Sequence, residues 1–419
     1  MAKIIFSINR LWDQKSMSID PKSAEEKFHA GILKYPPAFN QNRISPDDLL
    51  LMENLAEDLL SQDIQDLVII GMGGSSLGAK SIMPLLKFYK KADRNHFVHF
   101  WEGSHPELIM EISDRLKKRK SAALFISKSG TTMESRTMLG LYREFFPENP
   151  VFFITSHPEK VTDLGANEKN TFSIPENLGG RFSVVSPVGI LPGFFAGGDM
   201  YSFVKHFNET NEKLDISIPF SDNPAKIAAA QYYNLLTSGY TQPVFWSYTR
   251  KLKPFLDWIV QLWAESLGKA AHINAYPGTA LGPEDQHSLL QYHIQGPTTL
   301  LHTFFHVNSY GARDFVIPGE VKSISAGKTL WKVLHAQMKS IETALTDAKR
   351  PVSEFCIPEL NLDFMAELFS FWMHTVTYLC YLYDVNPFNQ PGVESGKIIC
   401  KKILTEDSMP DNLNQVFSI

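Results

Sequence analysis

The feature that most constrains this chain is a series of short apolar runs that alternate with helical stretches in its first half. The runs cover residues 67–70, 96–101, 122–126 and 151–155. Runs of this length, separated by helical patterns, are typical of buried strands joined by crossover helices. They predict a parallel sheet covered by helices on both faces, which is an α/β fold.

A second α/β unit is expected after about residue 205. An apolar run at 243–248 is followed by a helical pattern from about residue 254, and the C-terminal third reads as largely helical. With 419 residues the chain is too long for one simple core. We therefore expect two doubly wound αβα sandwiches, residues 1–205 and 206–419, the second carrying C-terminal helices.

Composition narrows the classes of partner. A formal net charge of -5 gives no basic field for nucleic acid, so any phosphate must be recognised locally. No apolar segment has the length that spans a bilayer, and residues 1–12 do not read as a secretory leader. The three cysteines, too few and too scattered for a disulfide framework, suit a reducing compartment. We expect a cytoplasmic protein with neither membrane nor nucleic-acid partners.

Two of the predicted strands end in loops rich in glycine and hydroxyl side chains. The first loop reads GMGGSSLG, in which Gly74 allows close backbone approach and Ser75 adds a hydroxyl beside the next helix. The second reads SKSGTT, which places the hydroxyls of Ser127, Ser129 and Thr132 around the ammonium of Lys128. Because ligands bind where strands of such sheets end, the loops predict a site for a small dianion such as a phosphomonoester.

The two loops leave several alternatives open on the sequence alone. Glycine-rich strand ends also occur for packing, and a serine-threonine turn can be a solvated helix cap. A dinucleotide fingerprint fails at Ser76, where a third glycine is required, although Glu102 could mimic its ribose-binding acid. A mononucleotide P-loop fails because Ala79 separates Gly78 from Lys80.

Taken together, the motifs resemble the glucose-6-phosphate isomerase family, also called phosphoglucose isomerases, in its shorter bacterial form. The likeness begins with GMGGSSLG and SKSGTT and extends in family order through four further stretches. These are GGRFSVVSPVGILP at 179–192, WAESLGK at 263–269, DQHSLLQ at 285–291 and NPFNQPGVESGK at 386–397. The resemblance implies sugar-isomerase-like sheets and interconversion of glucose 6-phosphate and fructose 6-phosphate through an enediol, without a cofactor.

The resemblance also assigns roles to particular residues. Glu265 matches the base that moves a proton between adjacent carbons, and Gln261, one helical turn earlier, matches an amide that contacts substrate. Arg181 matches the cation that stabilises the enediolate. Without the family, Glu265 would read as a solvated helical carboxylate and Arg181 as half of an ordinary ion pair.

The remaining roles concern ring opening and assembly. His287 matches the histidine that passes a proton during ring opening, and in the family it reaches the site from the neighbouring subunit. A homodimer is therefore implied. Lys397 matches a lysine that assists at the ring oxygen. Gln390 matches a glutamine that contacts the phosphate.

Two departures and two competing functions accompany this interpretation. SKSGTT replaces the SKTFTT of longer family members, and INAYPGTALGPED before His287 matches no family pattern. A relaxed isomerase or epimerase that also accepts mannose 6-phosphate would use the same loops, whereas a sugar-phosphate-binding regulator would not need the catalytic side chains. His302 and His306 have the spacing of a helical metal pair, but the run around them reads as a strand, so no metal site is expected.

Overall fold

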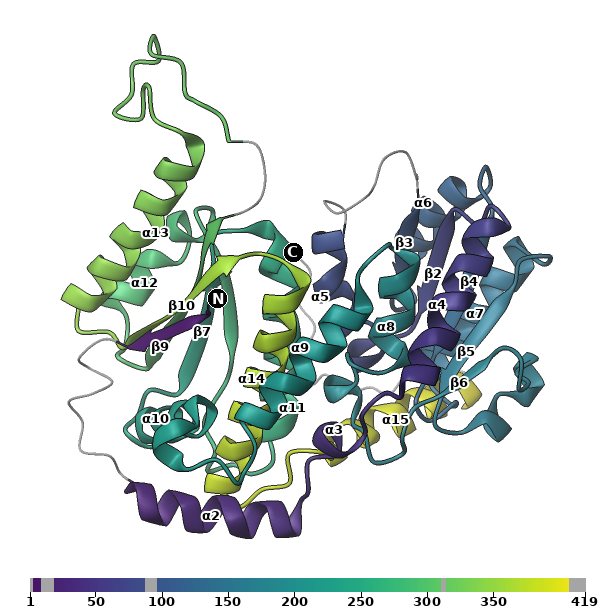
Figure 1. Ribbon diagram of the computed structural model, residues 1–419, viewed down its shortest axis with the longest axis horizontal. Helices are drawn as coiled ribbons and strands as arrows, with labels where there is room; N and C mark the ends of the chain where they lie inside the picture. Colours follow the sequence, from purple (N-terminus) through teal and green to yellow (C-terminus); the bar gives the residue numbers. More distant parts are fainter. Residues whose placement is uncertain (1–2, 9–18, 87–95, 310–313, 407–419) are drawn as a thin grey trace.

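The computed structural model describes residues 3–8, 19–86, 96–309 and 314–406. Two five-stranded sheets stand side by side in it, each flanked by helices (Figure 1). The predicted α/β class is confirmed. Part of the stretch considered for a leader, residues 1–2 and 9–12, lies outside the described residues.

The first sheet is entirely parallel, with the strand order β3-β2-β4-β5-β6. The four predicted runs form four of its strands. The bounds are β2 Asp66–Ile70, β3 Phe97–Trp101, β4 Ser121–Ile126, β5 Val151–Thr155 and β6 Thr171–Ser173. Alternate residues of β2 enter two separate cores, with Leu67 and Ile69 on one face and Val68 and Ile70 on the other.

Helices cover both faces of this sheet, as the apolar runs require. One face is packed by α4 (Pro46–Ser61), α5 (Leu77–Leu86) and α8 (Pro187–Phe195), and the other by α6 (Pro106–Leu116) and α7 (Met133–Phe145). The predicted start of α4 is observed, because the Ser45 hydroxyl accepts a hydrogen bond from the Asp48 amide at 3.0 Å.

The second sheet has the order β1-β10-β9-β7-β8, and only β1 runs antiparallel to its neighbour. Its strands are β1 Ile5–Ile8, β7 Gln242–Ser247, β8 Gly278–Leu281, β9 Leu300–Ser309 and β10 Val352–Glu359. The N-terminal strand therefore belongs to the sheet built by the C-terminal half. The stretch without a family match contains β8 and a cis Gly282–Pro283 bond.

One continuous core joins the two halves. It contains Ile69 of the first sheet, Phe245 of the second, and Trp258 and Trp372 from helices that lie against the second sheet. The helices of this half are α9 Met200–Lys213, α10 Pro224–Thr237, α11 Lys253–Leu267, α12 Leu290–Gln295, α13 Leu330–Asp347 and α14 Leu362–Leu382. Residue 205 falls within α9, and the division of the chain near it stays a prediction.

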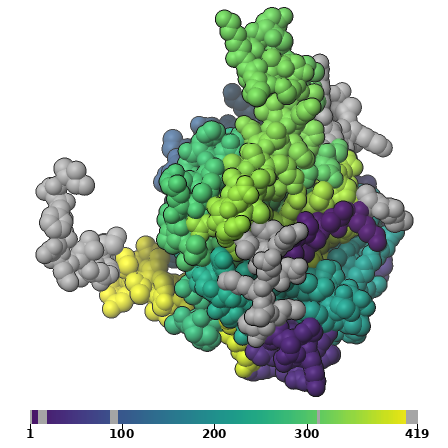
Figure 2. Space-filling model, turned by 90° about the vertical axis from the view of Figure 1, so that its left-hand side faces the viewer, coloured from purple at the N-terminus to yellow at the C-terminus, as the bar shows by residue number. Residues whose placement is uncertain are grey.

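The remaining helices lie near the ends of the chain, and one of them projects. α2 (Pro21–Lys34) and α3 (Ala38–Gln41) lead into the first half, and α15 (Glu394–Glu406) follows the last core helix. In Figure 2, α15 extends away from the body of the molecule. No helix in the described ranges is both long and apolar enough to cross a membrane.

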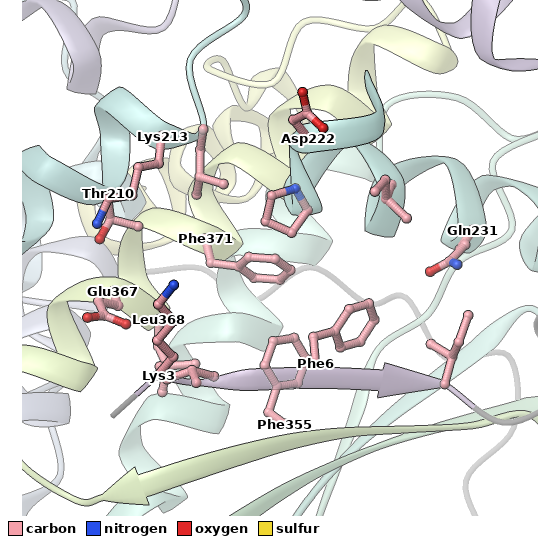
Figure 3. A pocket seen from close by; sticks show the side chains of 15 residues that line it. Lys3, Phe6, Thr210, Lys213, Asp222, Gln231, Phe355, Glu367, Leu368 and Phe371 are labelled. Carbon is pink, nitrogen blue, oxygen red and sulfur yellow. The ribbon is translucent and has the colours of Figure 1, made fainter. Parts of the chain in front are cut away.

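A cavity of about 650 Å³ opens between β1 and the helices α9, α10 and α14. The rings of Phe6, Phe355 and Phe371 lie together in it, and Lys213, Asp222 and Glu367 stand around them (Figure 3). None of the residues that line this cavity belongs to the predicted site. The loops that follow β2 and β4 form no part of this cavity.

Candidate active site

The first glycine-rich loop packs directly against the backbone that carries Arg181. A methyl group added at Gly74 would lie 2.3 Å from the carbonyl carbon of Gly180. Only glycine permits this approach, because the atoms it meets are main chain and cannot turn aside. The loop that follows β2 thereby fixes the short helical turn Gly180–Phe182, and with it the position of the Arg181 side chain.

Arg181 forms hydrogen bonds with several other residues of the site. Its guanidinium is buried and donates hydrogen bonds to the Ser266 hydroxyl at 2.8 Å and to a Glu265 carboxylate oxygen at 2.8 Å. It also donates to the side-chain oxygen of Gln390 at 3.1 Å and to the Asn389 carbonyl at 3.0 Å. Burial lowers the pKa of Arg181, and the Glu265 carboxylate opposes that shift. A cation held this firmly is preorganised to stabilise negative charge.

Glu265 is held from two sides and remains partly open. Gln261, one turn earlier on α11, donates from its amide nitrogen to one carboxylate oxygen at 2.9 Å, while Arg181 bonds the other oxygen. The side chain of Glu265 keeps 29% of its surface exposed, so a ligand can reach it. Within the described residues, the buried side-chain oxygen of Gln261 has no hydrogen-bond partner.

The second loop presents its hydroxyl groups before the start of α7. Ser127 and Thr132 bond to each other at 2.9 Å, and the Ser129 hydroxyl accepts from the Thr131 amide at 3.3 Å. Thr132 occupies the N-cap position, but its side chain makes no capping hydrogen bond. The side chain of Thr132 thus leaves the first amides of α7 uncapped, and a helix N-terminus favours an anion.

The two loops lie next to each other at the ends of paired strands. β2 and β4 are paired, and a methyl group at Gly71 would lie 3.1 Å from the carbonyl oxygen of Ile126. Lys128 is half-buried, and burial together with the Arg181 charge lowers its pKa, while Glu176 opposes the shift. Arg181, Glu265, Gln261 and Gln390 thus form one hydrogen-bonded polar cluster. The first loop packs against the turn that carries Arg181, and the second loop lies beside the first.

Two predicted residues are not brought into this cluster. His287 ends a short helical turn, Asp285–His287, and is exposed. Lys397 lies on α15, 62% exposed, and pairs with Glu394 at 2.7 Å. Neither forms a hydrogen bond with Arg181 or Glu265 in the part of the chain that the structure describes.

The charged residues of the two rejected nucleotide-binding motifs, and the histidines His302 and His306, have other partners. Lys80 and Glu102 form an ion pair with each other, so each of these charges is already matched. His302 accepts from the Trp246 indole at 3.2 Å, and His306 bonds His335 at 2.9 Å. The described ranges hold no group of three or more His, Cys, Asp or Glu side chains arranged for a metal ion.

Sequence reasoning missed several residues that shape the cluster. Ser266 and Asn389 accept from Arg181, and the Trp258 indole donates to the Arg181 carbonyl at 2.9 Å. Lys269 donates to the carbonyl and side-chain oxygens of Asn389, the latter at 3.2 Å. Ser266, Lys269 and Asn389 lie inside the motifs quoted above, so their place beside Glu265 and Gln390 was the available signal.

The chain has two sheets that are parallel except for β1, with a carboxylate-guanidinium cluster, and its family match places it in the class of sugar isomerases. Among solved structures, a hypothetical protein of Thermus thermophilus superposes with a TM-score of 0.79 at 27% identity, covering 96% of this chain and 100% of that one. A glucose-6-phosphate isomerase of Chlamydia trachomatis shares the fold with a TM-score of 0.74 at 19% identity, covering 96% of this chain and 78% of that one.

The sequence comparisons give the particular family. The phosphoglucose isomerase family model matches residues 58–417, and the chain belongs to that family. The glucose-6-phosphate isomerase of Methanocaldococcus jannaschii is 30% identical over 364 residues, which cover 86% of this chain and 89% of that protein. That of Thermus thermophilus is 32% identical over 360 residues, covering 81% and 84%.

Proposed function

We propose that this chain interconverts glucose 6-phosphate and fructose 6-phosphate through a cis-enediolate, the isomerase step of glycolysis and gluconeogenesis. The observation that carries the proposal is the partly exposed Glu265 carboxylate, held between the Gln261 amide and the Arg181 guanidinium in a member of the phosphoglucose isomerase family. Relatives with this activity match most of the chain.

In this mechanism Glu265 removes the proton from C2 of the open-chain aldose and returns it to C1. Negative charge then develops on the enediolate oxygens, where Arg181 stabilises it. The Gln261 bond fixes one oxygen of the base, so the carboxylate is oriented before the substrate arrives. The side-chain oxygen of Gln261, which lacks a partner among the described residues, accepts from a substrate hydroxyl.

The two strand-end loops hold the phosphate in this proposal. Gly74 and Ser75 line it from the first loop, and Ser127, Lys128, Ser129 and Thr132 from the second. The uncapped start of α7 adds main-chain amides, which suit a dianion. Gln390 completes the phosphate contacts from the loop that also accepts from Arg181.

Ring opening in this proposal uses His287 from a second copy of the chain, together with Lys397. His287 is exposed and forms no hydrogen bond with Arg181 or Glu265 among the described residues, as expected of a residue that serves a neighbour's site. Exposed apolar side chains gather on α15 and on residues 315–330, including Ile399, Leu404 and Ile324. Apolar surface of this kind is typical of a subunit interface, so we propose a homodimer in which His287 crosses the interface and Lys397 assists at the ring oxygen.

The cellular setting follows from the thiols and the substrate. Cys356, Cys380 and Cys400 are all free in the structure. Free thiols persist in reducing compartments, so we propose that the enzyme works in the cytoplasm.

The decisive experiment replaces Glu265 by Gln and measures fructose 6-phosphate conversion in a coupled assay without added metal. We expect kcat to fall by roughly 10²–10⁴-fold, the contribution of a positioned general base. Exchange of the C2 hydrogen of glucose 6-phosphate in D₂O should fall in parallel. Asp257→Asn is the matched control, since Asp257 lies two turns earlier on α11 and pairs with Lys253.

The outcomes separate the parts of the proposal. Inactive wild-type protein contradicts the isomerase function itself. Near-normal turnover in Glu265→Gln contradicts only the base assignment. Running the same assay with mannose 6-phosphate tests for the relaxed epimer specificity that the loops alone would permit.

A further inference from the structure

One carbonyl oxygen in the cluster accepts hydrogen bonds from two cations. Lys269 follows the end of α11 and donates to the Asn389 carbonyl and, at 3.2 Å, to the Asn389 side chain. Arg181 donates to the same carbonyl at 3.0 Å. Asn389 thus joins the helix that carries Glu265 to the turn that carries Arg181.

This arrangement brings like charges together in a half-buried place. Burial, and secondly the Arg181 charge, lower the pKa of Lys269 to about 8, while Cys380 and Glu265 oppose the shift. A lysine there costs desolvation and repulsion, and a surface position would cost neither. Two directed hydrogen bonds to a single residue offset that cost, so the contact concerns the geometry of Asn389 more than general stability.

The segment that contains Asn389 has a second anchor on its other side. The ring of Phe388 packs against Phe182 at 5.2 Å and Phe39 at 6.5 Å between centroids. The next residue after Asn389 is Gln390, whose side chain accepts from Arg181. With Phe388 held by rings and Asn389 by Lys269, the peptide that leads into Gln390 has little freedom.

Resting on the isomerase function proposed above, we infer that Lys269 is a positioning residue for catalysis. Its ammonium holds the Asn389 peptide, and through that peptide it sets Arg181 and Gln390 relative to Glu265. Lys269 acts through Asn389 and does not contact the substrate. Without the hydrogen bonds from Lys269 to Asn389, the Arg181 guanidinium can shift relative to the Glu265 carboxylate. Displacements of about 1 Å in such sites cost about a hundredfold in rate.

The test compares Lys269→Met with Lys253→Met in the same coupled assay. Lys253 begins α11, at the opposite end of the helix from Lys269, and pairs with Asp257, so it controls for loss of a lysine beside this helix. We expect Lys269→Met to lower kcat between about tenfold and a hundredfold, while KM for fructose 6-phosphate changes less than about threefold. Lys253→Met should keep wild-type kinetics.

Lys269→Arg and the pH profile of the rate distinguish a role in positioning the catalytic groups from a role in the stability of the fold. Arginine keeps its charge and can donate to the same oxygens, so it should restore most of kcat. The wild-type rate should decline near pH 8 as Lys269 loses its proton, and Lys269→Arg should move that decline to higher pH. A structural role alone would not move the profile, and Lys269→Arg gives a reading even where Lys269→Met fails to fold.

Three results would overturn the inference. These are unchanged kcat in Lys269→Met, a rise in KM alone, or an alkaline limb that Lys269→Arg leaves in place. Failure of the proposed function shows itself separately, as absence of wild-type conversion.

Discussion

At the scale of single residues, Gly74 does more than the sequence indicated. It was predicted to let the loop approach a phosphate, but in the structure its missing side chain also makes room for the backbone of Gly180. The partner lies far along the chain, so no local pattern around Gly74 could reveal it. Gly74 therefore makes a contact between two motifs, in addition to the phosphate approach proposed for it.

We expect Gly74→Ala to lower both the stability of the fold and the catalytic rate. A methyl group 2.3 Å from a main-chain carbon forces the backbone apart, at a cost of about 1–3 kcal/mol in the free energy of unfolding. Because the turn carrying Arg181 shifts with it, kcat should fall as well. Urea denaturation and the coupled assay measure the two effects.

Gly140→Ala is the matched control for this substitution. Gly140 lies within α7, and a methyl group there meets nothing within 4 Å. Alanine should leave activity intact and raise stability by up to about 1 kcal/mol through helix propensity. Equal behaviour of the two variants would contradict the role given to the Gly74 contact.

At the scale of elements, the success of prediction followed the strength of the local pattern. β2 and β4 were predicted because all their residues are buried, which leaves uninterrupted apolar runs in the sequence. β1 and β8 were not predicted, since a short edge strand such as β1 alternates exposed and half-buried residues and depends on its neighbour for order. Pairing across the whole chain decides such strands.

Some residues of the site could likewise be predicted from local motifs, and others could not. Glu265, Gln261, Arg181 and Gln390 could be predicted from motifs, and the structure brings these side chains together. The Asn389 carbonyl could not be predicted, because every residue carries such an oxygen and only the fold selects one. His287 and Lys397 were predicted from motifs too, but the structure does not bond them to Arg181 or Glu265, and the role proposed for His287 needs a second chain.

α15 provides the test of that assembly. Ile399 and Ile403 are spaced for one face of the helix, Ile398 points to another side, and α15 has no buried residue. If the apolar face docks on a second copy, Ile399→Asp places an unpaired carboxylate in the interface. We expect the dimer dissociation constant to rise at least about tenfold in sedimentation, with activity lost on dilution.

Ile398→Asp is the control for α15, since the change is the same and that side chain points away from the proposed contact. A wild-type protein that sediments as a monomer with full activity would contradict the dimer. Equal effects of the two substitutions would instead show that the face carrying Ile399 and Ile403 is not the surface involved.

At the scale of the whole molecule, one continuous core joins the two sheets and encloses polar groups that have no part in the proposed chemistry. His374 of α14 is buried in it, and the Phe39 ring packs edge-on at 5.1 Å. Burial lowers the pKa of His374 to about 3, against an ordinary value of about 6.5. A neutral imidazole is therefore part of the folded state throughout the physiological range.

This histidine should make the fold sensitive to acid. Above pH 6.5 neither state binds the proton, and its stabilising effect is complete; as pH falls from 6.5 toward 3, the unfolded chain alone is protonated and stability is lost. At pH 5 the loss is about 2 kcal/mol from this group. His374→Phe keeps an aromatic ring in the core, so the difference in unfolding free energy between pH 7 and pH 5 should shrink by that amount.

His105→Phe, which removes a side chain that is 69% exposed, should leave the pH dependence unchanged. Urea titrations of the three proteins at both pH values measure it, and an identical pH dependence in wild type and His374→Phe would mean that the core admits the charged ring.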